Sequence, residues 1–188
     1  MNDHSEADPD WAAIEIFLTS HGAQTEPHPG GTLLQHLLRV RERLARWQAP
    51  TEVQLAGLCH AVYGTDGFPR ADLPIERRDE LTALIGEQAE AIVYLYDSCE
   101  RRTTYPRFKA GEQPVFRDRF TGAEQSAPPA QARAFAEITA ANELDIVAHN
   151  PEAARRYGAG LARLLDRMSG LLSPDAVHAY TTELAVFR

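Results

Sequence analysis

Hydrophobic residues recur every three or four positions along most of this chain, which is the period of an amphipathic α-helix. Residues 115–125 break the pattern, and a glycine-containing turn there predicts a small β-hairpin. Residues 101–107 are predicted to be a basic linker. Helices are predicted at 9–20, 32–47, 52–62, 75–84, 87–96, 128–149, 151–168 and 174–186. The pattern therefore predicts an all-α fold with a small β-hairpin. It also predicts a single domain over 9–188 after a flexible leader at 1–8.

The segment from His28 to Asp66 concentrates the residues that could carry chemistry, with three of the seven histidines. His36 borders the apolar face of the helix at 32–47. The helix at 52–62 is apolar on nearly all sides, which is typical of a buried helix. His60 is then a polar group inside the core, where it needs hydrogen-bond partners. Imidazoles bind zinc and iron and carry protons near pH 7, so we expect a site here, with a structural role for His60 as the alternative.

A later helix and one turn supply the other candidates for this site. Asn142 and Asp145 are three residues apart, so they share one face of the helix at 128–149, and both are polar within an apolar stripe. Asn142 could hold a substrate by hydrogen bonds, and Asp145 could orient an imidazole or complete a metal site. Tyr63 follows His60 in a turn that contains glycine, and this turn would put its phenol at the rim of the pocket. The predicted catalytic residues are His36, His60, Tyr63 and Asn142.

The charge of the chain limits its partners. The formal net charge is −8, so we expect neither nucleic acid nor a membrane as a partner. No apolar run approaches the roughly 20 residues that span a bilayer, and the acidic N-terminus is unlike a signal peptide, so a cytoplasmic protein is expected. Cys59 and Cys99 are expected to be small core residues rather than a disulfide.

Basic residues could still form a local anion site in this acidic chain. Arg77 and Arg78 also suit a solvated helix face. The residues predicted to bind substrate are Arg77, Arg78, Arg101, Arg117 and Arg119.

The order of these residues resembles the HD superfamily of metal-dependent phosphohydrolases. That layout has a histidine on one helix, an A-x-L-x-H helix and an acidic or polar residue on a later helix. The nearest similarity is to the hydrolase domains that cleave guanosine pentaphosphate alarmones, whose A-L-L-H-D-x-x-E-D-T segment is similar to Ala56–Thr65. Their F-G-x-x-V-A-x-L-V pattern is similar to Leu84–Val93. The resemblance runs from about His36 to Asp145 and implies an HD-like helical bundle.

A second resemblance rests on two short motifs. The chain carries H-x-G-G-T-L-L-x-H at residues 28–36 and H-x-V-Y-G-T at residues 60–65. Both motifs resemble those of a bacterial family of unknown function. This resemblance implies no activity.

The chain departs from the HD pattern at both carboxylates. Ala61 stands where that family has its metal-binding aspartate, and Asn142 aligns with its final aspartate ligand. Two histidines and an amide are a poor site for a hard divalent ion. A shifted register would recruit Asp145 instead. The alternative metal set is then His28, His36, His60 and Asp145, for iron, manganese or zinc.

The resemblance and the residues together favour an enzyme that processes a small molecule in a histidine-lined pocket. The expected chemistry is acid–base catalysis, with a metal or without one. A non-catalytic ligand-binding or regulatory domain is one alternative, and a metal-dependent phosphohydrolase acting on nucleotides is another. A second copy of the chain, forming a homodimer, is a further candidate partner.

Overall fold

The computed structural model describes residues 8–109 and 111–188, and nearly all of its regular structure is helical. The predicted leader lies outside the described residues except for Asp8. The helices are α1 Trp11–Ser20, α2 Leu33–Arg46, α3 Thr51–Cys59, α4 Arg78–Ile85, α5 Glu87–Ser98, α6 Arg101–Thr104, α7 Pro129–His149, α8 Pro151–Met168 and α9 Pro174–Glu183. Short 3-10 turns lie at Ile75–Arg77, Tyr105–Arg107, Ser169–Leu171 and Ala185–Phe187. The predicted all-α class is confirmed.

Two antiparallel strand pairs complete the fold. Strands β1 (Pro27–His28) and β2 (Gly31–Thr32) form one pair directly before α2. Strands β3 (Val115–Arg117) and β4 (Glu124–Ser126) form the other. The second pair is the predicted hairpin. The first pair was not predicted, because two residues per strand are too few to show an alternating pattern.

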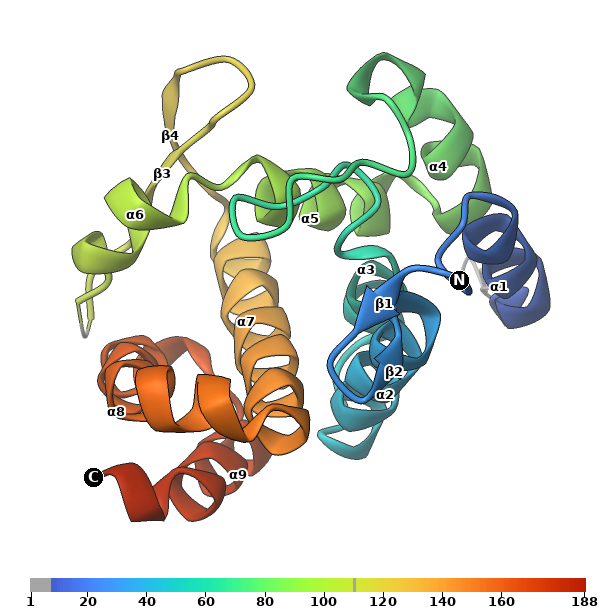
Figure 1. Cartoon of the computed structure of the whole chain (residues 1–188). Coiled ribbons are helices and arrows are strands. Elements are labelled where there is room, and N and C mark those ends of the chain that lie inside the picture. The colour runs from blue at the N-terminus through green and yellow to red at the C-terminus, as the bar shows by residue number, and fades with distance from the viewer. Residues whose placement is uncertain (1–7, 110) are drawn as a thin grey trace, which may run out of the picture.

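Helix α7 is the central element (Figure 1). The pair α2 and α3 packs on one side of it, and α8 and α9 pack on the other. Helix α5 contacts both α3 and α7, while α1 and α4 lie beyond the α2–α3 pair. Residues about 100 positions apart in the sequence therefore meet where α2, α3 and α7 come together.

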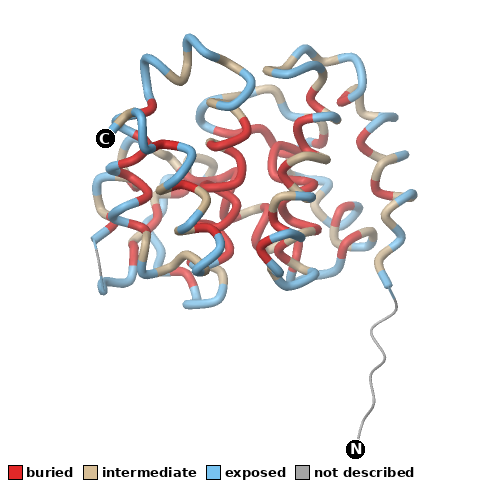
Figure 2. Tube along the Cα trace, turned by 90° about the horizontal axis from the view of Figure 1, so that it is seen from below, coloured by how far each residue is buried: buried red, intermediate tan, exposed pale blue. Residues whose placement is uncertain are grey.

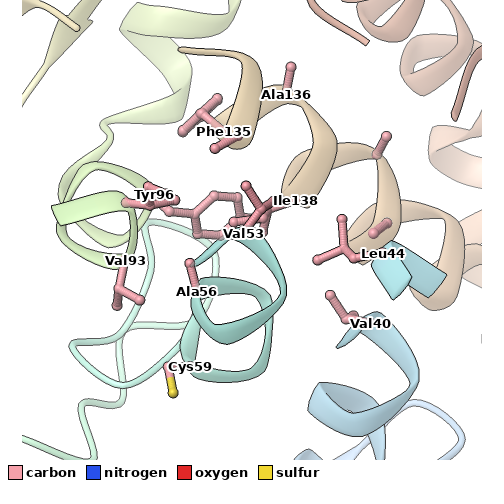
Figure 3. Packing of buried hydrophobic residues seen from close by; sticks show 14 of the residues in the cluster. Val40, Leu44, Val53, Ala56, Cys59, Val93, Tyr96, Phe135, Ala136 and Ile138 are labelled. Atoms are coloured by element: carbon pink, nitrogen blue, oxygen red, sulfur yellow. The ribbon is translucent and has the colours of Figure 1, made fainter. Parts of the chain in front are cut away.

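The core fills the space between these helices (Figure 2). In Figure 3, Val53 and Ala56 of α3 lie between the side chains of α5 and those of α7, with Tyr96 and Phe135 among their neighbours. All four side chains are buried. Helix α3 is buried over most of its length, as its sequence predicted.

Two local predictions need correction. Residues 101–107 were predicted to be a linker, but they form α6 and a 3-10 turn. Helix α3 ends at Cys59 instead of continuing to residue 62, because the chain turns at His60.

Cys59 and Cys99 are buried free thiols, as predicted. In the ranges 8–109 and 111–188, every helix is too short or too polar to cross a membrane.

Gly57 allows the close approach of α2 and α3. A Cβ atom at this position would overlap Cδ1 of Leu44 on α2, and Leu44 is itself completely buried. The spacing between the helices that carry His36 and His60 therefore depends on a residue without a side chain.

We predict that Gly57→Ala lowers the free energy of unfolding by about 2 kcal/mol, because an added methyl group overpacks this contact. Thermal and urea denaturation would measure the loss. Gly160→Ala on α8 is the matched control, since a Cβ there meets nothing within 4 Å. The control should stabilise the fold by about 0.5–1 kcal/mol through helix propensity. Equal effects of the two substitutions would contradict the prediction.

Candidate functional site

The first turn of α2 fixes the direction of His36. Gly30 and Gly31 have φ angles of 79° and 134°, a left-handed conformation that suits glycine and lets β1 turn back into β2. Thr32 then begins α2 with a capping box: its hydroxyl accepts from the N–H of Gln35, and Gln35 Oε1 accepts from the N–H of Thr32. The H-x-G-G-T-L-L-x-H motif thus forms the start of α2, and its last residue, His36, lies one turn into the helix.

His36 forms a buried pair with Asp145 of α7. Its Nδ1 lies 2.7 Å from Asp145 Oδ2. Arg39, one turn further along α2, donates to both carboxylate oxygens at 2.7 and 2.9 Å. Burial alone would raise the pKa of Asp145, but the hydrogen bonds from His36 and Arg39 outweigh it and hold this pKa well below its usual range. An ionised carboxylate only accepts hydrogen bonds, so Nδ1 of His36 carries the proton.

His60 is held from the end of α3. Its Nδ1 donates to the carbonyl of Gly57 at 2.7 Å, and the side chain is 3% exposed. Burial, followed by repulsion from His36, lowers the pKa of His60 to about 3. His60 is therefore neutral near pH 7, with its free lone pair on Nε2.

The two rings meet at Asn142 of α7. Asn142 Oδ1 lies 3.0 Å from Nε2 of His36 and 3.0 Å from Nε2 of His60. The amide is oriented from the other side, because its Nδ2 donates to Oε1 of Glu143 at 3.1 Å. If both rings are neutral, three lone-pair atoms face one another. A donor must then come from a proton on one Nε2, from an amide turned so that Nδ2 faces the rings, or from a bound electropositive group.

A cavity of about 450 Å³ opens over these groups. We call it the histidine cavity. His28 lines it and stacks on His36, with ring centroids 4.1 Å apart. Burial, followed by repulsion from His36, lowers the pKa of His28 to about 4. The lining residues are His28, Leu33, His36, His60, Ala61, Thr65, Gly67, Phe68, Arg101, Asn142, Glu143, Ile146, Ala153 and Tyr157.

Tyr63 does not reach the cavity, so its predicted place at the rim is wrong. The chain turns after α3, and the N–H of Tyr63 donates to buried Asp97 at 2.8 Å. This turn directs the phenol to Glu90 of α5, which accepts at 2.9 Å. Burial and the Glu90 bond raise the pKa of Tyr63. Tyr63 is a core residue in a polar cluster away from the histidines.

Only Arg101 of the five predicted substrate-binding arginines lines the histidine cavity. It lies 3.4 Å from Glu143 through Nη1. Arg77 pairs with Glu80 on the exposed face of α4, while Arg117 belongs to β3 and lies outside the cavity lining.

Arg78 and Arg119 have structural partners instead. Arg78 donates to both oxygens of Glu90, at 2.7 and 2.6 Å. Arg119 donates to the backbone carbonyls of Asp97 and Gly64, both at 2.8 Å. Their guanidinium groups hold the segments around α5 together, so only Arg101 of the predicted anion site remains at the cavity.

The predicted metal set of His28, His36, His60 and Asp145 does not form. Asp145 binds Nδ1 of His36, the nitrogen opposite the one that faces His60. The stacked rings of His28 and His36 are inclined by 28°, so their in-plane lone pairs run side by side instead of converging. Within residues 8–109 and 111–188, no three His, Cys, Asp or Glu side chains are grouped to hold a metal ion. Asn142, rather than Asp145, stands between the two histidines.

Sequence reasoning missed Arg39 and Glu143. Arg39 follows His36 by three residues, so it lies on the same face of α2 and near the same partner. Glu143 follows Asn142 and sets the orientation of its amide. The spacing in the first case was visible in the sequence, whereas nothing in the sequence marks the second.

The comparisons with known proteins found one match. The model of a domain of unknown function (DUF6817) matches residues 17–101. This range contains His28, His36 and His60 but ends before α7, which carries Asn142 and Asp145. Neither the curated proteins nor the solved structures gave a match.

The depressed pKa of His60 predicts a dependence of stability on pH. Unfolded His60 takes up a proton below about pH 6.5, whereas the folded residue does so only near pH 3. The free energy of unfolding should therefore fall as the pH is lowered from about 6.5 towards 4. His60→Gln should reduce this slope by about one proton, or roughly 1.4 kcal/mol per pH unit.

Urea denaturation at pH 7, 6 and 5 would measure the slope. His178→Gln, at an exposed position on α9, is the matched control and should retain the slope of the wild type. A His60→Gln slope equal to that of the wild type would contradict the assignment of His60 as a neutral buried imidazole.

Proposed function

We propose that this protein is an enzyme that processes a small polar molecule in the histidine cavity by acid–base catalysis. One observation carries the proposal: Nε2 of His36 and Nε2 of His60 converge on the same point while their Nδ1 atoms are fixed by acceptors. Two fixed imidazoles at a cavity wall give a substrate two proton acceptors of defined direction. A solely structural pair would not need to border a cavity.

The two histidines have different roles in this proposal. Asp145 accepts from Nδ1 of His36, as the carboxylate does in an Asp–His pair, and so directs the Nε2 lone pair of His36 to the cavity, where it is the base that receives a proton from the substrate. His60 remains neutral and accepts a hydrogen bond from a substrate O–H or N–H. Asn142 lies between both rings and binds the substrate, while Arg101 contributes a positive charge at the wall. His36 can return its proton to the leaving group in a later step.

A metal ion is a second branch of the proposal. Nε2 of His36, Nε2 of His60 and Oδ1 of Asn142 would hold it, and two imidazoles suit zinc or iron better than magnesium or manganese. Asp145 would orient His36 from behind, as carboxylates commonly do for metal-bound histidines. A bound ion would act as a Lewis acid and lower the pKa of a coordinated water.

We also propose kinship with the HD superfamily. The placement of His36 on α2, His60 at the end of α3 and Asn142 on α7 supports it, because these are the positions at which the resemblance expects ligands. Ala61 lines the cavity next to His60 without offering a ligand. A phosphohydrolase of the usual two-carboxylate type is therefore the less favoured alternative, and a ligand-binding or regulatory domain is the other.

The proposed partner is a small molecule, with neither nucleic acid nor a membrane involved. A second copy of the chain, forming a homodimer, is the further candidate. The cytoplasm is the proposed location. Two buried free cysteines suit a reducing compartment, where thiols stay reduced.

We predict that His36→Gln lowers turnover by about 10²–10⁴-fold, because it removes the base. The measurement is untargeted mass spectrometry of a mixture of small metabolites incubated with purified protein, followed by rates for any compound consumed. Asp145→Asn should also lower the rate, since an amide at this position no longer fixes the tautomer of His36. His178→Gln is the control and should match the wild type. Retention of compounds without conversion would favour the ligand-binding alternative.

Metal titration tests the second branch. We expect Zn²⁺ to bind wild-type protein at one site by calorimetry and His60→Gln to remove that binding, while His178→Gln retains it. Mg²⁺ and Mn²⁺ should not bind there, because the donor set lacks a carboxylate. Stoichiometric Mn²⁺ in protein purified without chelators would instead support the phosphohydrolase alternative.

A further inference from the structure

The histidine cavity is bounded from both sides of helix α7. The segments before α2 and after α3 contribute His28 and Phe68, whose rings stand edge to face with centroids 6.1 Å apart. Helix α8, which packs on the opposite side of α7 (Figure 1), contributes Ala153 and Tyr157. Ile146 of α7 lines the cavity as well. Aromatic rings from both sides of α7 therefore line a space of about 450 Å³, which is in the range of sites that hold small organic ligands.

Tyr157 is the most exposed aromatic residue of this lining. In the ranges 8–109 and 111–188, the exposed large apolar residues are Ile16, Tyr157 and Val186, and of these only Tyr157 lines the histidine cavity. Tyr157 is 56% exposed. An aromatic ring at the wall of a cavity offers a flat apolar surface that a ligand can cover. The position of Tyr157 therefore favours contact with a flat apolar body.

The formal charges of the lining balance each other. Of the arginine, lysine, aspartate and glutamate residues that the structure describes, only Arg101 and Glu143 line this cavity. Arg101 Nη1 lies 3.4 Å from Glu143 Oε1. An ion bound beside this pair would compensate one member and lie next to the like charge of the other, which is unfavourable. The lining therefore favours a ligand without net charge.

The lining also presents hydrogen-bond acceptors that lack donors. Oε1 of Glu143 accepts from Asn142 and Arg101, whereas Oε2 accepts no hydrogen bond from any described residue, and the side chain is 22% exposed. His60 donates from Nδ1 to the carbonyl of Gly57, so the lone pair of this ring is on Nε2. A ligand with an O–H or N–H group can supply the missing donor.

We propose that the histidine cavity binds an uncharged planar ring that carries an O–H or N–H donor, with Tyr157 as a ligand-binding residue. The ring covers Tyr157 and Phe68, and its donor reaches Oε2 of Glu143 or Nε2 of His60. Phenols are the simplest compounds of this class. The inference rests on the proposed function, because it takes the same cavity as the place where the small molecule binds.

Four single-ring probes separate these requirements. 4-Ethylphenol has the ring and the donor and is uncharged at pH 7, whereas 4-ethylanisole lacks the donor, 4-ethylcyclohexanol lacks the flat ring and 4-ethylbenzoate carries a charge. In NMR titrations of the wild-type chain, 4-ethylphenol should bind saturably and the other three about tenfold more weakly. Equal binding of 4-ethylphenol and any of the three would overturn the proposal, as would tighter binding of a nucleotide such as AMP.

Substitutions of Tyr157 place the binding in this cavity. Tyr157→Ala should weaken the binding of 4-ethylphenol about tenfold, whereas Tyr157→Phe keeps the ring and should stay within about twofold of the wild type. Val186→Ala is the matched control, since it truncates an exposed apolar side chain outside the cavity. All three substitutions change exposed positions, and circular dichroism would check that the fold is retained. An affinity unchanged by Tyr157→Ala would contradict the role of Tyr157.

Binding and turnover together distinguish this inference from the proposed function. Saturable binding of 4-ethylphenol that depends on Tyr157, without conversion of any compound in the metabolite mixture, would support the inference and count against the enzyme. Turnover of a compound without a planar ring, with a KM unchanged in Tyr157→Ala, would overturn the inference and leave the enzyme in place.

Discussion

The carboxylate of Asp145 joins three segments of the chain. It lies on α7, it accepts from His36 and Arg39 of α2, and Arg39 donates in turn to the carbonyls of Pro29 and Gly30 in the turn between β1 and β2. A buried carboxylate is tolerated only when its oxygens are satisfied by donors. This one charge therefore constrains three features: the position of α2 against α7, the conformation of the turn between β1 and β2, and the direction of the His36 ring.

This constraint makes the histidine pair asymmetric. Nδ1 of His36 donates to a carboxylate, whereas Nδ1 of His60 donates to the carbonyl of Gly57 and burial lowers the pKa of that ring. Asn142 then presents an oxygen to both rings because Glu143 holds the amide nitrogen. A site with two carboxylates at this place would attract a hard cation. Here residue 61 is an alanine and residue 142 an amide, so the ring nitrogens of His36 and His60 face the cavity without either carboxylate beside them.

The sequence could predict these helices and their shared faces because both follow from periodicity. His60 was correctly expected to be a buried polar group that needs partners, although it follows the last residue of α3, and Asn142 and Asp145 were correctly placed on one face of α7. The sequence left two roles for Asp145, orienting an imidazole or binding a metal, since a shift of one turn decides whether Asn142 or Asp145 faces the cavity. Tyr63 and Arg119 show the same limit, because their partners depend on how the chain turns. Tyr63 bonds to Asp97 and Glu90 of α5, and Arg119 donates to the carbonyls of Asp97 on α5 and of Gly64 after α3.

Helix α7 shows how burial cost and chemistry are linked in this fold. Four of its buried residues are polar: Glu137, Thr139, Asn142 and Asp145. Thr139 donates to the carbonyl of Phe135 one turn earlier, and Asp145 accepts from His36 and Arg39. Asn142 donates to Glu143, while its Oδ1 faces the two histidines. On this fully described helix, Glu137 alone keeps an unpaired side-chain oxygen. The other oxygen of Glu137, Oε1, accepts from the N–H of Ser173, just before α9. The buried polar side chains of α7 therefore connect this helix to α2 on one side and to the start of α9 on the other.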